Sequence, residues 1–155
     1  MFGDVELTVH CAAELLKRAP EYDYLIAPEA KAIPLLYEMA RQSGAEKYFL
    51  ARKGAKAYMT GVFEVEVRSI TTMHIQKLVI DTADAEMIKG KKVLIVDDVI
   101  STGESLHAME ELVKRAGGII AGKMAVLAEG DAKDRDDIIT LAPLPLFNAD
   151  GSVKE

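Results

Sequence analysis

Two neighbouring carboxylates and a short polar turn occur together near the middle of the chain. The apolar residues 93–96 are followed by Asp97 and Asp98, and residues 101–105 read Ser-Thr-Gly-Glu-Ser. Because the backbone N–H groups that open a helix lack partners and carry the positive end of its dipole, this turn can bind a phosphate group. Gly103 has no Cβ to block the anion, and the two carboxylates can accept hydrogen bonds from sugar hydroxyls. The segment therefore predicts a site for a phosphorylated sugar.

The same turn also has structural interpretations. Ser101 and Glu104 have the spacing of a helix capping box, and carboxylates at strand ends are often simply solvated. A cap and a phosphate site can coexist, and the segment lacks the Gly-Lys-Ser/Thr ending of a nucleoside triphosphate-binding loop. We therefore assign the sugar and its phosphate to Asp97, Asp98, Ser101, Thr102, Gly103, Glu104 and Ser105.

The apolar pattern predicts the elements that must position these residues. Helical spacing is found at residues 9–16, 32–39 and 104–116, and short apolar runs typical of buried strands at residues 24–27, 48–51, 92–97 and 119–127. Residues 61–81 show an alternation typical of a hairpin, and residues 142–155 are expected to form an irregular tail. Strands that alternate with helices indicate an α/β fold with a mostly parallel twisted sheet flanked by helices, in which ligands bind at the carboxyl ends of the strands.

Length and charge limit the function classes. The 155 residues, half of them hydrophobic, suit one domain over residues 1–155, and 19 basic against 25 acidic residues argue against nucleic-acid binding. No run approaches the roughly 18 apolar residues of a membrane span, so we expect a cytoplasmic protein without a membrane partner. The single cysteine, Cys11, is expected to be buried and structural. The three histidines match no metal-ligand set.

Residues 93–105 resemble the signature of the type I phosphoribosyltransferases, which is four apolar residues, two acids and a Thr-Gly turn. Over nearly its whole length the chain looks most similar to adenine phosphoribosyltransferases. Residues 2–5 resemble a segment near the base site of that family, and residues 26–31 resemble its pyrophosphate loop. Residues 52–56 resemble the basic run before its mobile lid, and residues 141–147 its C-terminal signature.

The chain also departs from that family. Gly3 and Lys31 stand where arginine is usual, and Ala32 where glycine is usual. Residues 68–72 look more like bacterial xanthine phosphoribosyltransferases, and only Met1 precedes Phe2. The resemblance therefore implies a type I phosphoribosyltransferase fold with a short or missing N-terminal hood.

The resemblance also implies a reaction. A purine, most readily adenine, would displace pyrophosphate from phosphoribosyl pyrophosphate, with Mg²⁺ bound mainly through the substrate and residues 55–75 as a flexible lid in a homodimer. Xanthine or guanine as the base, or a non-catalytic sensor of phosphoribosyl pyrophosphate, are the alternatives. The residues implied are Asp97, Asp98 and Arg52 for catalysis, Glu29, Ala30, Lys31, Arg52, Lys53 and Lys56 for pyrophosphate, and Phe2 and Glu129 for the base.

Overall fold

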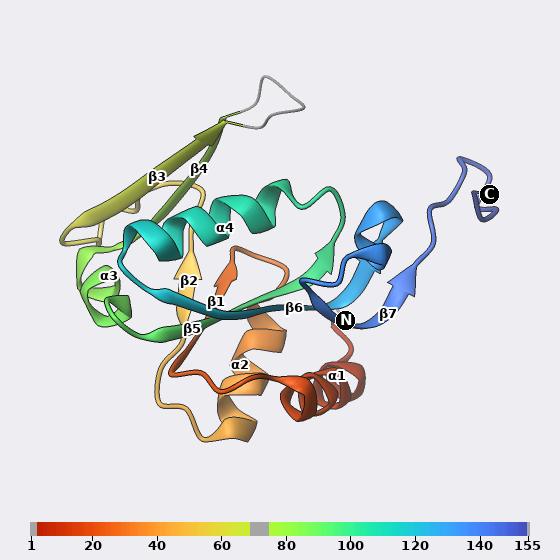
Figure 1. The fold of residues 1–155 in the computed structure, drawn as a ribbon, viewed down its shortest axis with the longest axis horizontal. Coiled ribbons are helices and arrows are strands. Elements are labelled where there is room, and N and C mark those ends of the chain that lie inside the picture. The colour runs from red at the N-terminus through yellow and green to blue at the C-terminus, as the bar shows by residue number, and fades with distance from the viewer. Residues whose placement is uncertain (1–2, 69–74, 155) are drawn as a thin grey trace.

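Five parallel strands form the centre of the molecule. The computed structural model describes residues 3–68 and 75–154. The sheet has the order β2-β1-β5-β6-β7, and every neighbouring pair is parallel (Figure 1). These strands are β1 (Tyr24–Pro28), β2 (Phe49–Ala51), β5 (Lys92–Ile100), β6 (Ile119–Glu129) and β7 (Ile139–Leu144). The predicted α/β fold with a parallel sheet is confirmed.

Helices cover both faces of this sheet. Helices α1 (Val5–Arg18) and α2 (Ile33–Ser43) lie on one face, and α4 (Glu104–Arg115) lies on the other (Figure 1). Successive side chains of a strand point to opposite faces, so Leu94 packs with the cluster around α1 and α2, whereas Ile95 packs with the cluster around α4. Burial on both faces explains why the central strand is a continuous apolar run.

A separate antiparallel hairpin lies beside α4. It consists of β3 (Val62–Arg68) and β4 (Ile75–Asp81), and its Val65 and Leu78 belong to the core cluster around that helix. Two backbone hydrogen bonds of 2.8 Å between Arg52 and Val79 join β4 to the chain just after β2. The body of the hairpin is therefore attached to the sheet. The flexible lid remains a prediction, and its residues 69–74 lie outside the described part of the chain.

One strand and one α-helix were not predicted. The expected irregular tail was wrong for residues 142–144, which complete β7. Pro143 interrupts no ladder there, because β7 is an edge strand and its other side needs no N–H donor. Helix α3 (Thr82–Ile88) has only seven residues, too few for a helical period to be recognised. No helix in the described part of the chain is long and apolar enough to cross a membrane.

Candidate active site

A cavity of about 680 Å³ opens at the carboxyl ends of β1 and β5. Its walls come from the loops after β1 and β2, from strand β4, from the end of β5 and from the first turn of α4. The lining residues are Pro28, Glu29, Ala30, Lys31, Lys53, Ile75, Gln76, Lys77, Leu78, Asp97, Asp98 and Ser105. This is the edge at which a parallel α/β sheet binds its ligands. Seven of the predicted site residues thus meet in one cavity.

The two aspartates lie on β5 immediately after its most buried stretch. Both are half-buried, and the backbone N–H of Asp98 donates to Oδ1 of Asp97 at 2.8 Å. Burial, reinforced by the adjacent Asp98 carboxyl, raises the pKa of Asp97 to about 7, although Lys31 acts in the opposite direction. Near neutral pH, Asp97 can therefore both accept a hydrogen bond from a sugar hydroxyl and exchange a proton.

The polar turn after β5 differs from the capping box that its sequence suggested. Gly103 is the N-cap residue of α4, with a φ of 83° that favours glycine, and the cap has no side-chain hydrogen bond. The backbone N–H of Glu104 instead points to Oγ1 of Thr102, at 3.4 Å. The capping-box interpretation does not hold, because Gly103 and not Ser101 is the N-cap residue; the helix begins at Glu104, as the sequence predicted. Ser105 lines the cavity and Thr102 is exposed at its turn.

The basic residues near the cavity divide into two groups. Lys31 and Lys53 line it, are exposed, and form no ion pair with any described residue. Arg52 is not in the lining: its Nη1 donates to Oε1 of Glu29 at 3.0 Å, and its guanidinium lies 5.8 Å from the centre of the Tyr58 ring. Arg52 is thus connected to the cavity through Glu29, which does line it.

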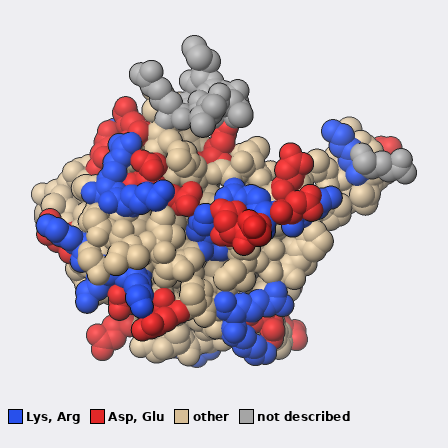
Figure 2. Space-filling model, in the orientation of Figure 1, with Lys and Arg blue, Asp and Glu red and all other residues tan. Residues whose placement is uncertain are grey.

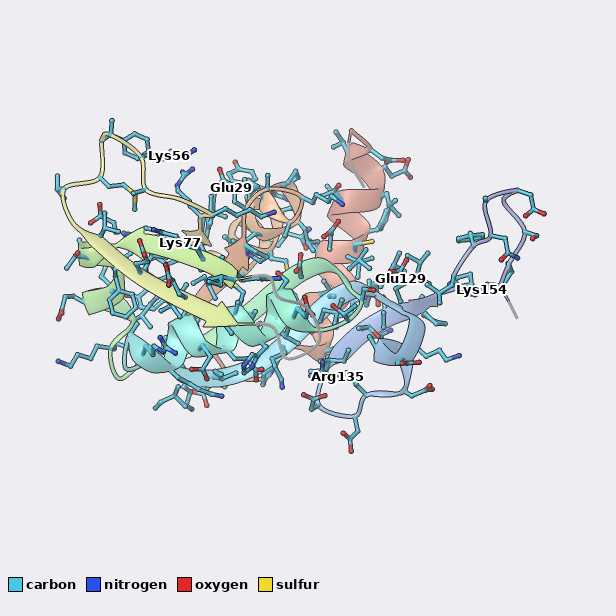
Figure 3. The ribbon with its side chains drawn as sticks, turned by 90° about the horizontal axis from the view of Figure 1, so that it is seen from above. Glu29, Lys56, Lys77, Glu129, Arg135 and Lys154 are labelled. Atoms are coloured by element: carbon cyan, nitrogen blue, oxygen red, sulfur yellow. The ribbon has the colours of Figure 1, made fainter. Side chains whose placement is uncertain are left out.

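Lys56 lies in the loop between β2 and β3, outside the cavity lining. Figure 3 shows it beyond Glu29, toward the outer edge of the molecule. Its backbone N–H contacts the sulfur of Met59 at 3.3 Å, which stabilises a local turn.

Two polar lining residues were not predicted as site residues from the sequence. Gln76 and Lys77 lie on β4, and Lys77 pairs with Glu64 of the neighbouring strand at 2.6 Å. No local motif marks either residue. They reach the cavity only because the hairpin folds back along the sheet edge, a contact that spacing along the chain does not encode.

The predicted base contact Glu129 lies outside the cavity. Glu129 ends β6 and is not in the cavity lining, and Figure 3 shows it well separated from Glu29 and Lys77. A second pocket of about 330 Å³ adjoins the end of β6 and is lined by Ala128, Lys133, Asp134, Thr140, Leu141, Ala142 and Pro143. Phe2 lies outside the described residues.

A family model described as the phosphoribosyl transferase domain matches residues 8–143. The chain belongs to this family. The matched range includes every described site residue considered above. Among the residues that the structure describes, no group of three or more His, Cys, Asp or Glu side chains is placed to hold a metal ion by itself.

Several phosphoribosyltransferases are similar to this chain. The adenine phosphoribosyltransferase of Thermotoga sp. (strain RQ2) is 36% identical over 110 residues, which cover 70% of this chain and 60% of that protein. The adenine phosphoribosyltransferase of Kosmotoga olearia is 32% identical over 134 residues, covering 81% and 69%. The orotate phosphoribosyltransferase of Caldanaerobacter subterraneus is 30% identical over 111 residues, covering 72% and 47%. The chain thus spans about 60% of the length of the first two curated relatives that it matches.

Solved phosphoribosyltransferase structures have the same fold. The crystal structure of adenine phosphoribosyltransferase from Thermoanaerobacter pseudethanolicus has a TM-score of 0.75 at 24% identity, covering 92% of this chain and 84% of that one. The enzyme from Leishmania donovani has a TM-score of 0.72 at 17% identity, covering 92% and 66%. The predicted type I phosphoribosyltransferase fold is confirmed.

Proposed function

We propose that this chain transfers the 5-phosphoribosyl group from phosphoribosyl pyrophosphate to a purine base, most readily adenine, and releases pyrophosphate. One observation carries the proposal: in a member of this family, Asp97, Asp98 and Ser105 line the same cavity as Lys31 and Lys53, which form no salt bridge with the described residues. Acceptors for sugar hydroxyls, donors for a phosphate and cations for a leaving pyrophosphate are thus present around one space of suitable size.

The end of β5 and the following turn would hold the ribose 5-phosphate. Asp97 and Asp98 accept hydrogen bonds from the ribose hydroxyls, and their negative charge favours the cationic character that develops at the ribose C1 as its bond to pyrophosphate breaks. The backbone N–H groups of residues 101–105, with the hydroxyls of Thr102 and Ser105, donate to the 5-phosphate. The sugar is thereby held in one orientation relative to the incoming base.

The opposite wall would hold the pyrophosphate. Lys31 and Lys53 offer charge-assisted hydrogen bonds to its oxygens, and Lys77 adds a third cation from β4. Glu29 fixes Arg52 beside them. These cations act on charge that increases as the bond to C1 breaks, so they stabilise the transition state more than the bound substrate.

Magnesium fits this cavity. Glu29, Asp97 and Asp98 line it with carboxylate oxygens, the ligand type that Mg²⁺ prefers, and the substrate's phosphates would supply most of the other ligands. When bound, Mg²⁺ would neutralise charge on the pyrophosphate.

The identity of the base rests on the relatives. Of eight similar curated proteins, seven are named adenine phosphoribosyltransferases and one is named an orotate phosphoribosyltransferase, which supports adenine. Phe2 and Glu129 are the proposed base contacts. A homodimer in the cytoplasm completes the proposal.

The test is a base-competition assay on the purified chain. Phosphoribosyl pyrophosphate and Mg²⁺ are incubated with adenine, guanine, xanthine or orotate, and the mononucleotide and pyrophosphate are quantified by chromatography. We expect AMP and pyrophosphate in equal amounts with adenine, and no product when Mg²⁺ is chelated. Product with xanthine or guanine alone would mean that the base is not adenine, but the proposed reaction would stand. Calorimetric binding of phosphoribosyl pyrophosphate without product from any base would instead support a sensor.

A further inference from the structure

Arg135 lies directly against the turn that precedes α4. It follows the short 3-10 helix η1 (Gly130–Asp134), far from that turn in the sequence. A Cβ built on Gly103 would stand only 2.6 Å from Nη1 of Arg135. The positive φ of Gly103 favours glycine, and a side chain at this position would displace the guanidinium from the turn.

The guanidinium is held in this place by a paired carboxylate. Nε and Nη2 of Arg135 donate to the two oxygens of Asp137 at 2.8 and 2.7 Å, a bidentate geometry that fixes the plane of the group. Lys123 contacts the same carboxylate and also Glu110 of α4, at 3.1 Å. The side chains of Lys123 and Glu110 are only 14% and 17% exposed. This network links β6, the loop after η1 and α4.

One edge of the guanidinium stays available. Nη1 of Arg135 makes no hydrogen bond with the described residues, and it is the atom that faces Gly103. The network of Arg135, Lys123, Asp137 and Glu110 has no net charge. Because Asp137 pairs with one edge of the guanidinium, the other edge faces the turn.

We infer that Arg135 is a further phosphate-binding residue, whose Nη1 donates to the 5-phosphate held by residues 101–105. Asp137 and Lys123 are positioning residues that act through it. This inference rests on the proposed function and deepens it: the phosphate would be held by a side-chain cation as well as by the backbone. A purely structural ion pair would instead stabilise the fold and leave ligand affinity unchanged.

The experiment compares Arg135→Ala with Arg115→Ala. Arg115 is a matched control, because it also pairs with an acid, Glu111, but at the other end of α4. Isothermal titration calorimetry measures ribose 5-phosphate and, separately, pyrophosphate with Mg²⁺. We expect R135A to bind ribose 5-phosphate about tenfold or more weakly, as for a lost hydrogen bond to a charged group. Its pyrophosphate affinity, and both affinities of R115A, should stay within about twofold of wild type.

The possible failures are distinguishable. Equal affinity of R135A and wild type for ribose 5-phosphate would overturn the inference and leave the proposed function intact, and so would an equal loss for both ligands. A wild-type chain that binds neither ligand would overturn the proposed function itself. If R135A does not fold, Arg135→Gln replaces it, because glutamine keeps a hydrogen bond toward Asp137 without the charge; the same two affinities then decide.

Discussion

The carboxyl edge of the sheet consists of two halves that use their charges differently. In the half formed by β1, β2 and β5, the cations Lys31 and Lys53 form no salt bridge with the described residues and line a cavity of about 680 Å³. In the half formed by β6 and β7, Lys123 and Arg135 are paired with Asp137, and the pocket is about 330 Å³. Figure 2 shows basic and acidic side chains interspersed over one face of the molecule, without a broad basic surface there.

This difference between the two halves distinguishes charged groups that can bind a ligand from charged groups that stabilise the fold. A cation without a partner costs little at an open cavity and is free to meet an anionic substrate, whereas a paired one has its interactions already satisfied. The first half therefore carries the reaction in our proposal, and the second half supports it. Arg135 is the exception in the second half, since one edge of its paired guanidinium still faces the turn before α4. In the first half, Arg52 and Lys77 are also paired, with Glu29 and Glu64.

The largest effect should come from the two acids of the first half. Asp97→Asn combined with Asp98→Asn should lower kcat/KM by about 10³-fold or more, roughly 4 kcal/mol, because both the ribose contacts and the favourable charge are lost. Steady-state kinetics checks this. Asp131→Asn with Asp134→Asn removes two acids from the second half and should change kcat/KM less than about twofold. A similar loss of kcat/KM in both double variants would contradict the assignment of the reaction to the first half.

The cations should show the same contrast on a smaller scale. Lys31→Ala should lower kcat/KM for phosphoribosyl pyrophosphate by about 10- to 100-fold, the effect of losing one charge-assisted hydrogen bond. Lys133→Ala, which removes a lysine from the second pocket, should have an effect below about twofold. The comparison is made at two salt concentrations, and the K31A defect should shrink at high salt. A salt-independent defect in both variants would argue for a structural cause.

The raised pKa of Asp97 predicts that replacing this residue stabilises the fold, although replacing both aspartates lowers activity. A carboxyl whose pKa rises from its ordinary value to about 7 on folding destabilises the fold increasingly between pH 4 and 7, and fully above pH 7. Asp97→Asn should therefore stabilise the chain by about 1–3 kcal/mol at pH 8, which corresponds to roughly 2–4 °C per kcal/mol in Tm, and much less at pH 4.5. Thermal unfolding at both pH values measures this. An unchanged or lower Tm at pH 8 would show that Asp97 is not destabilised by its surroundings.

The smallest effect on the KM for phosphoribosyl pyrophosphate should come from replacing Glu129. Glu129→Gln should change the KM for phosphoribosyl pyrophosphate by less than about twofold, because this residue does not line the main cavity. If it contacts the base, the KM for adenine should rise by about three- to tenfold, as for one lost hydrogen bond. A rise in the KM for phosphoribosyl pyrophosphate alone would place Glu129 with the first half.

The fold was predictable where burial alone determines the pattern. Residues 93–96 form a continuous apolar run because a central parallel strand is covered on both faces, and such a run is visible in the sequence. The strand that ends at Leu144 was missed because its proline suggested a loop, although an edge strand tolerates proline. Helix α3 was missed because it is too short to show a period.

The site was predictable where its residues are contiguous. Asp97, Asp98 and the turn after them lie within one segment, so their types and order could be interpreted directly. Lys77 and Arg135 were missed because each reaches the site from a distant element, and nothing in their local sequence records that contact. The start of α4 at Glu104 was predicted correctly, but its cap was not, because a left-handed glycine stands there in place of a side-chain cap.

The position of Asp97 on β5 has a consequence for how the molecule opens. Residues 93–96 are almost completely buried, and Asp97 pairs with Ala125 in the sheet's interior. Backbone amides in such a strand exchange with solvent only when the whole domain unfolds, whereas residues 146–154, which project from the body and are largely exposed, open first (Figure 1). The two acids that we propose to bind ribose thus belong to the last part of the molecule to open, and partial unfolding or proteolysis at the C-terminal end should leave them in place.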